Sequence, residues 1–175
     1  MVSILDWSVR SVYRSIGKKI GTLSEYDLRP DSIDAFLYVN CLQPNGKVVL
    51  DIGANNGDSA KLFLGHGAKK VICVEINERQ AKKIKSPHTE VLIEPFRLSH
   101  LLISHDCMKM DIEGGEYLLL NYEGQIKPSI IEVHSWILAK QFQMKGWNIL
   151  TYISPKGVVL MSNFIPAIDG VSGVL

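Results

Sequence analysis

The chain has 175 residues, a formal net charge of +1 and 46% hydrophobic residues. This composition excludes an intrinsically disordered chain and gives no charge argument for binding nucleic acid or a membrane surface. Three scattered cysteines, Cys41, Cys73 and Cys107, show no disulfide or metal-binding spacing. We therefore expect buried core thiols in a cytoplasmic protein, and no membrane segment because no apolar run is long enough.

The first 44 residues are predicted to form a helical extension. Apolar residues at helical spacing over 4–20 predict an amphipathic helix. A second helix is predicted over 33–42, ended by Pro44, Asn45 and Gly46. We expect this extension to act as a lid or to pack against the domain or against a second copy of the chain. A homodimer is therefore possible.

Residues 45–175 alternate between strand and helix patterns and are predicted to form one domain. Strands are expected at 47–52, 70–75, 90–93, 107–112 and 129–134. Helical segments are expected between them at 58–65, 78–84, 98–104 and 115–120, with another at 136–144. The stretches 147–154 and 158–164 flank a turn at 155–157 and predict a hairpin. This order predicts a three-layer α/β domain with a mostly parallel sheet.

The most informative stretch is 48–58, which reads VVLDIGANNGD. An apolar run ends in Asp51, and Gly53 and Gly57 frame a turn in which the backbone can bend tightly. Asp58 or Ser59 is expected to cap the helix that follows. Because ligands of open α/β sheets bind beyond the carboxyl ends of the strands, this turn predicts a ligand site.

Acidic residues end four of the predicted parallel strands, with Asp51 on the first and Glu75 on the second. Glu75 follows Asp51 by 24 residues, a position suited to binding ribose hydroxyls, as in NAD sites. However, the turn is Gly-Ala-Asn-Asn-Gly rather than Gly-x-Gly-x-x-Gly, and Asp51 would repel a pyrophosphate. S-adenosyl-L-methionine offers an ammonium, a ribose diol and no phosphate, so this pattern favours it over NAD.

These residues carry a resemblance to a known family. The stretch from Asp51 to Ser59 resembles motif I of class I S-adenosylmethionine-dependent methyltransferases. With Lys-Met-Asp-Ile-Glu-Gly-Gly-Glu at 109–116, the chain resembles the FkbM family of that Rossmann-like superfamily. The resemblance implies a seven-stranded sheet of order 3-2-1-4-5-7-6 with strand seven antiparallel. It implies cofactor contacts at Asp51, Gly53, Asn55, Gly57 and Glu75. We add Asp111 to the predicted cofactor contacts, and Glu94 and Phe96 are the candidates near the adenine.

The remaining strand ends are predicted to do the chemistry, with Asp111, Glu113 and His134 as candidate catalytic residues. Glu132 and His134 share a face of one strand because side chains alternate with a period of two. Carboxylates and a histidine there could ligate a divalent cation, or His134 could be the general base for a substrate hydroxyl. The sequence alone does not decide between them, and we predict no metal ligand. Glu116 is open to a role at a helix N-terminus.

The predicted function is methyl transfer from S-adenosylmethionine to a hydroxyl of a small molecule or sugar. The chain lacks the Asn/Asp-Pro-Pro-aromatic sequence that amino-group methyltransferases of bases usually carry, and its cysteines do not suit covalent attack on a pyrimidine. Two alternatives stay open: an RNA methyltransferase, for which basic residues such as Arg10, Arg14 and Lys18 argue, and an inactive module that binds the cofactor or a nucleotide. The net charge disfavours nucleic acid.

Overall fold

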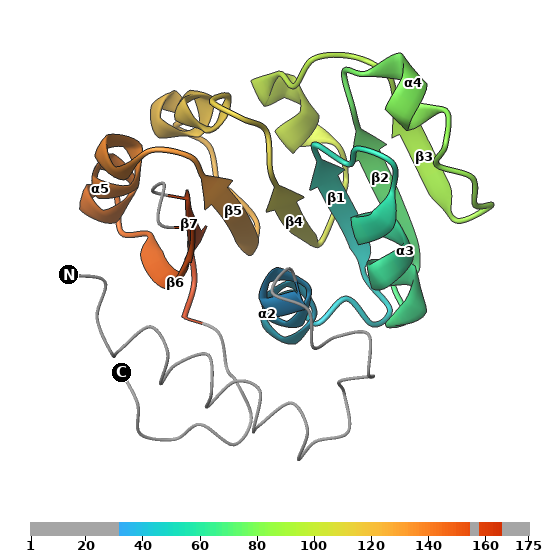
Figure 1. The fold of residues 1–175 in the computed structure, drawn as a ribbon, viewed down its shortest axis with the longest axis horizontal. Helices are drawn as coiled ribbons and strands as arrows, with labels where there is room; N and C mark the ends of the chain where they lie inside the picture. The colour runs from blue at the N-terminus through green and yellow to red at the C-terminus, as the bar shows by residue number, and fades with distance from the viewer. Residues whose placement is uncertain (1–31, 155–157, 166–175) are drawn as a thin grey trace.

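The computed structural model describes residues 32–154 and 158–165 (Figure 1). Its strands are β1 (Val48–Ile52), β2 (Lys70–Val74), β3 (Thr89–Leu92), β4 (Cys107–Met110), β5 (Ser129–Val133), β6 (Asn148–Ser154) and β7 (Val158–Ser162). Its α-helices are α2 (Ser32–Leu42), α3 (Asp58–Gly65), α4 (Glu78–Ala81) and α5 (Trp136–Met144), and two 3₁₀ helices are η2 (Leu98–Leu102) and η3 (Glu116–Asn121). The helix expected over 4–20 and the turn at 155–157 lie outside the described residues.

The seven strands form one sheet in the order β3-β2-β1-β4-β5-β7-β6. The first five pair in parallel, whereas β7 pairs antiparallel with both β5 and β6. The predicted fold class and strand order are thus confirmed. Because β1 lies between β2 and β4, the chain leaves β1 in one direction and later returns on its other side. A ligand site is expected above that reversal point.

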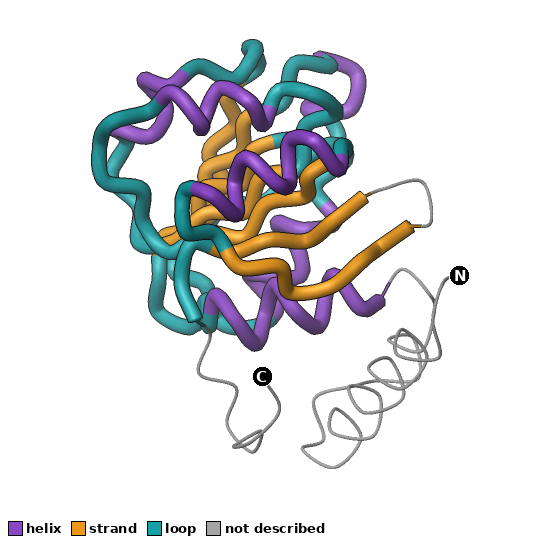
Figure 2. The backbone as a smooth tube through the Cα atoms, turned by 90° about the vertical axis from the view of Figure 1, so that its left-hand side faces the viewer, coloured by secondary structure: helices purple, strands orange, loops and turns teal. Residues whose placement is uncertain are grey.

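Helices cover both faces of the sheet, which gives three layers (Figure 2). Alternate residues of β1 enter different clusters, because side chains of a strand alternate between faces. Leu50 and Ile52 pack with residues of η2, η3 and α5 on one face, including Phe142. Val49 packs on the other face with residues of α2 and α3, including Phe63. All three predicted core cysteines are buried there as free thiols.

Helix α2 is part of this core. Leu37 and Leu42 are almost fully buried, and the Tyr38 and Phe63 rings lie 6.3 Å apart between α2 and α3. For residues 32–42, the part of the extension that the structure describes, packing against the domain is therefore what is observed. No helix in the described ranges combines the length and apolarity needed to cross a bilayer.

The helix boundaries show where local prediction failed. Helix α4 ends at Ala81, three residues earlier than expected, because the Lys83 and Ile84 amides donate to carbonyls three residues back and tighten the chain into 3₁₀ turns. The two segments expected to be helical near 98–104 and 115–120 are 3₁₀ helices. The predicted cap of α3 is wrong: Gly57 occupies the cap without a side-chain bond, and Ser59 donates to Asp51 instead.

Candidate functional site

The turn between β1 and α3 has the tight geometry that its glycines predicted. Gly53, Asn55 and Gly57 have φ angles of +76°, +47° and +86°. The Gly53 amide donates to the Val74 carbonyl, which ties the turn to β2. A Cβ on Gly53 would lie only 1.8 Å from the Asp111 carbonyl oxygen. Gly53 thus lets the turn approach the segment after β4, and no other residue fits without displacing it.

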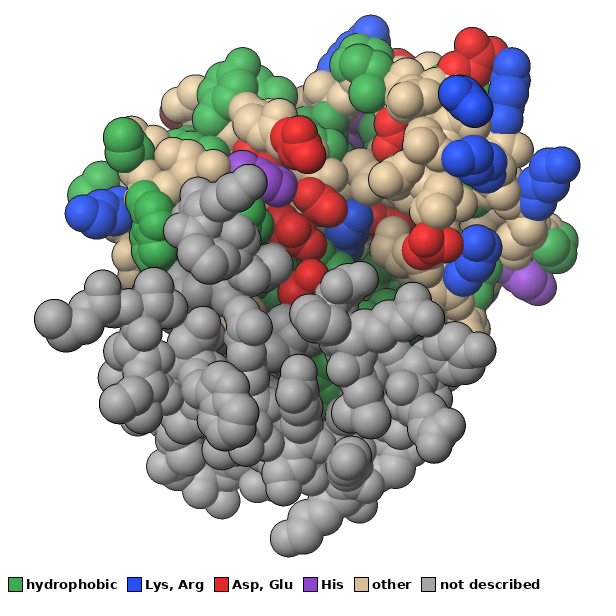
Figure 3. Space-filling view, in the orientation of Figure 1, with side chains coloured by type: hydrophobic (Ala, Val, Ile, Leu, Met, Phe, Trp, Pro, Cys, Tyr) green, Lys and Arg blue, Asp and Glu red, His purple; other side chains and the backbone are tan. Residues whose placement is uncertain are grey.

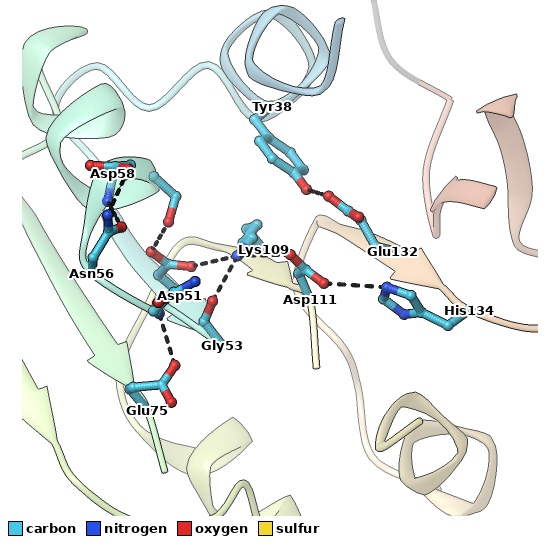
Figure 4. Close-up of polar contacts among 12 residues, drawn as sticks. Tyr38, Asp51, Gly53, Asn56, Asp58, Glu75, Lys109, Asp111, Glu132 and His134 are labelled. Carbon is cyan, nitrogen blue, oxygen red and sulfur yellow. Dashed lines mark hydrogen bonds and ion pairs between the residues drawn. The ribbon is translucent and has the colours of Figure 1, made fainter. Parts of the chain in front are cut away.

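Glu75 follows β2 and is fixed beneath this turn. Its Oε2 accepts a hydrogen bond from the Asn55 amide at 2.8 Å (Figure 4). Its Oε1 accepts one from the Asn77 amide at 2.7 Å. Two backbone donors hold the carboxylate in one orientation, and remaining lone pairs can accept further bonds. Glu75 is therefore an acceptor preset at the carboxyl edge of the sheet.

Glu75 lines the larger of two adjoining cavities, which has a volume of about 670 Å³. That volume lies within the usual range of small-molecule sites. Ile76 and Phe96 contribute apolar lining, whereas Glu75, Glu94, Asp111 and Glu113 contribute carboxyl groups. Among the described residues that line it there is no lysine or arginine. The chemistry of this lining suits a cationic ligand with apolar parts and disfavours a pyrophosphate.

The candidate adenine residues both line this cavity, as their sequence position suggested. The Glu94 Oε1 lies 3.0 Å from the His100 Nε2, and this hydrogen bond lowers the pKa of Glu94. The Phe96 and His100 rings are tilted against each other at 5.9 Å. Glu94 is consequently partly held by the protein rather than free to turn toward solvent.

Asp51 is occupied by partners inside the protein. It is 0% exposed, and its Oδ2 accepts a hydrogen bond from the Ser59 hydroxyl at 2.6 Å. Its Oδ1 lies 3.3 Å from the Nζ of Lys109, an ion pair without a well-directed hydrogen bond. Asp51 and Gly57 are not among the residues that line either cavity, whereas Gly53 and Asn55 line both. The predicted cofactor contacts at Asp51 and Gly57 stay predictions.

Lys109 is a central residue that the sequence analysis did not single out for a role. It stands opposite Asp51 in the β1–β4 register, donates to the Gly53 carbonyl at 3.0 Å and lies 3.9 Å from Asp111 Oδ2. Burial lowers the pKa of Lys109, but the attraction of Asp51, Asp111 and Glu132 outweighs it and raises the pKa overall. The lysine therefore stays charged and holds the turn against β4. A charged residue within the apolar strand Cys-Met-Lys-Met was the available signal.

The smaller cavity, about 380 Å³, adjoins the first and shares Gly53, Asn55 and Asp111 with it. Tyr38 of α2, Lys109 of β4 and Glu132 of β5 also line it. In Figure 3, carboxylate side chains gather near the middle of the visible face beside a histidine, and most visible lysines and arginines lie toward one side. The two cavities thus meet at Asp111, where negative charge is concentrated.

The polar strand ends beside the smaller cavity come together as predicted. Asp111, Glu132 and His134 each offer a ligand-type atom, and these atoms all lie within 4.8 Å of one another. The His134 Nε2 lies 3.6 Å from the Asp111 Oδ1. We call these three residues the acid–histidine cluster.

Two further side chains form hydrogen bonds with residues of this cluster. The Tyr38 hydroxyl donates a hydrogen bond to Glu132 Oε1 (Figure 4). Glu116 Oε1 lies 2.6 Å from His134 Nδ1. Tyr38 was not predicted as a site residue, since 94 positions separate it from Glu132. Glu116 had been considered only near a helix N-terminus, whereas its fully buried carboxylate orients the histidine.

The cluster is electrostatically crowded. Burial and then the neighbouring Asp111 raise the pKa of Glu132. The hydrogen bond to Glu116 is the main cause that raises the pKa of His134, with Asp111 and Glu132 adding to it. Neighbouring carboxylates contribute to both shifts, and this part of each shift favours bound protons or another cation.

Glu113, the remaining candidate catalytic residue, lies elsewhere. It is exposed and lines the larger cavity, and it is not among the described residues that line the smaller one. The structure thus brings Asp111 and His134 together but leaves Glu113 at the rim. Its catalytic role stays a prediction.

Comparison with known proteins finds similarity of fold only. No protein-family model matches the sequence, and none of the curated proteins does. A candidate RNA methyltransferase from Pyrococcus horikoshii superimposes with a TM-score of 0.55 at 20% identity, over 75% of this chain and 81% of that one. The C-terminal domain of precorrin-6Y C5,15-methyltransferase from Rhodobacter capsulatus gives 0.57 at 13% identity, over 75% and 86% of the two chains. A protein named precorrin 8W decarboxylase from Methanobacterium thermoautotrophicum gives 0.58 at 13%, over 76% and 90%.

These likenesses establish the architecture. At such identities they carry no information about substrate. This chain combines the seven-stranded order, the glycine turn after β1 and the acid after β2. The solved structures that resemble it include several methyltransferases. The protein has the Rossmann-like fold of class I S-adenosylmethionine-dependent methyltransferases.

Proposed function

We propose that this protein is an S-adenosylmethionine-dependent methyltransferase, related to the FkbM family, that methylates a hydroxyl oxygen of a small molecule such as a sugar. The observation that carries the proposal is the pair of cavities joined at Asp111. The larger suits a cationic, phosphate-free cofactor, and the smaller presents proton-accepting groups to a second molecule. A methyl-transfer enzyme needs two such sites in contact.

The cofactor would lie in the larger cavity. Glu75 would accept hydrogen bonds from the ribose hydroxyls, because two backbone amides already hold its carboxylate in place. Gly53 and Asn55 would let backbone approach the amino-acid end, while Ile76 and Phe96 would contact the adenine. Bound there, S-adenosylmethionine supplies an electrophilic methyl group on a sulfonium.

The acceptor would lie in the smaller cavity with its hydroxyl toward the acid–histidine cluster. Asp111 lines both cavities and would face the acceptor oxygen close to the methyl group. The hydroxyl proton would leave to solvent beside this cluster, whose negative charge would stabilise the positive charge that develops on the acceptor oxygen as it takes the methyl group. Lys109 holds the turn between the two cavities through the Gly53 carbonyl, so the relative position of the two ligands is fixed by β4. Positioning would supply most of the rate enhancement.

The cofactor assignment is tested by titration calorimetry with S-adenosylmethionine, its demethylated product and NAD⁺. The wild type is expected to bind the first two and not the third, since a carboxylate-lined cavity repels pyrophosphate. Glu75→Ala is expected to weaken binding at least tenfold, at about 1.4 kcal/mol per factor of ten. The matched control is Glu90→Ala on the neighbouring strand β3, whose carboxylate pairs with Lys70 and is not among those lining the two cavities. Equal affinity in the Glu75→Ala and wild-type proteins would reject the site.

The acceptor class is tested with radiolabelled cofactor. Methyl transfer to hydroxyl-bearing small molecules, including sugars, and not to RNA is the expected result. Transfer to RNA alone would contradict this proposal and support an RNA methyltransferase instead. A folded protein that binds neither the cofactor nor its product would favour an inactive module.

A further inference from the structure

We propose that the acid–histidine cluster is a divalent-cation site, in which Asp111, Glu132 and His134 Nε2 are the ligands. The role given to the cation deepens the proposed function and rests on it, whereas the binding itself does not.

The donor atoms have suitable spacing. All three lie within 4.8 Å of one another, and His134 Nε2 lies 3.6 Å from Asp111 Oδ1. Around a cation with ligand distances of about 2.1 Å, neighbouring donors are about 3 Å apart and opposite donors about 4.2 Å. To occupy neighbouring positions, His134 Nε2 and Asp111 Oδ1 need to approach by about 0.6 Å, and the other donor pairs by at most about 1.8 Å. Two carboxylates and one imidazole suit a cation such as Mn²⁺.

The contact between Glu116 and His134 is an observation independent of the donor spacing. Glu116 is 0% exposed, accepts from His134 Nδ1 through Oε1, and leaves Oε2 without a hydrogen-bond partner among the described residues. Burying a carboxylate this way is costly. A carboxylate behind the far nitrogen is the usual companion of a metal-binding histidine, because it fixes the ring and raises its basicity.

The other ring nitrogen of His134, Nε2, faces Asp111 and also needs a partner. With its Nδ1 proton on Glu116, a neutral His134 presents the Nε2 lone pair toward Asp111. An ionised carboxylate has no proton to donate to that lone pair. Either a proton on Nε2 or a metal cation between the two atoms satisfies both. Tyr38 similarly occupies one oxygen of Glu132 and turns the carboxyl group into a fixed ligand.

The local charge balance also calls for a cation. Asp51, Asp111 and Glu132 act on Lys109, which lies nearest Asp51, and Glu116 adds a fourth carboxylate beside His134. Among the described residues, Lys109 is the lysine that pairs with this group. A protonated His134 would offset only one more of them, whereas a divalent ion offsets two.

Three protein ligands leave coordination positions open. An acceptor hydroxyl that takes one of them is more acidic than in water. Its proton then leaves to solvent, its oxygen lone pair forms the new O–C bond, and the electron pair of the broken S–C bond stays on the cofactor sulfur. His134 is thus a ligand in this scheme and not the general base.

The test uses Mn²⁺ as the probe on metal-stripped full-length protein, without cofactor. Calorimetry is expected to give one site per chain, and Asp111→Asn and His134→Gln are each expected to weaken binding at least tenfold. Pulsed electron paramagnetic resonance should detect ¹⁴N coupling to the bound Mn²⁺, which His134→Gln removes. Glu116→Gln should weaken binding about tenfold while retaining the ¹⁴N coupling, as expected of a residue acting through the histidine.

Asp58→Asn is the matched control, because Asp58 lines the same cavity but pairs with Lys61 outside the cluster. Affinity unchanged in this variant supports the assignment. A loss as large as that of Asp111→Asn would overturn it, as would no saturable Mn²⁺ binding below about 1 mM. Cofactor binding measured in parallel separates the two ideas: binding of S-adenosylmethionine without Mn²⁺ binding rejects the cation site alone.

Discussion

Lys109→Met is expected to destabilise the protein strongly, because it leaves the buried Asp51 carboxylate without its charged partner. Lys109 and Asp51 are 5% and 0% exposed at their side chains, and their charged atoms lie 3.3 Å apart. Removing one partner of such a pair costs about 3–5 kcal/mol, since the remaining charge is buried without compensation. For a chain of this size that corresponds to a melting temperature about 6–20 °C lower.

Urea denaturation of four proteins measures this effect: the wild type, Lys109→Met, Asp51→Asn and the double variant. The double variant removes both charges, so we expect it to be more stable than Lys109→Met, with a coupling of about 1–3 kcal/mol. Lys70→Met is the matched control. Its pair with Glu90 is about half exposed and is expected to contribute no more than about 1 kcal/mol. A Lys109→Met cost equal to that of Lys70→Met, or strictly additive losses in the double variant, would refute the reasoning.

Three further outcomes follow from the structure. Gly53→Ala should reduce the free energy of unfolding several times more than Gly146→Ala. Both glycines have positive φ, but only a Cβ on Gly53 would meet backbone, at 1.8 Å. Equal losses of about 1 kcal/mol in the two variants would contradict the packing of the turn. Burial raises the pKa of the cysteine thiols, to about 12 for Cys41 and Cys73 and about 11 for Cys107, so less than about 1% is thiolate at pH 8. Iodoacetamide at that pH should label all three in urea and none in the native protein, and mass spectrometry showing rapid native labelling would contradict their burial. In a filter-binding assay, RNA affinity should be absent or independent of salt; a steep fall in affinity with rising salt would instead support the RNA alternative.

The layout of the site was largely predictable because strand ends are local signals. Asp51, Glu75, Asp111 and Glu132 each come at or just after an apolar run, and the carboxyl ends of parallel strands meet at one edge of a sheet. Strand bounds agree to within two residues because burial on both faces gives continuous apolar runs.

What the sequence did not predict depends on register between distant strands. Lys109 faces Asp51 only because β1 and β4 pair in this alignment, and Glu116 reaches His134 only after β5 is placed beside η3. The same holds for Tyr38, whose partner comes from the other end of the domain. The sequence predicted helical segments here but not their 3₁₀ type, because 3₁₀ and α-helices differ by one residue in hydrogen-bond spacing, which apolar periodicity over five or six residues does not resolve.

Asp111 has a consequence for how the two ligands influence each other. Asp111 lines both cavities, and its carbonyl is packed against Gly53 of the turn between β1 and α3. Occupancy of one cavity changes the electrostatic field and the freedom of a residue that contributes to binding in the other. Thermodynamic reciprocity then requires that the factor by which the cofactor alters acceptor affinity equals the factor by which the acceptor alters cofactor affinity. Residues shared by both cavities, Asp111 among them, would make the two binding equilibria one linked system.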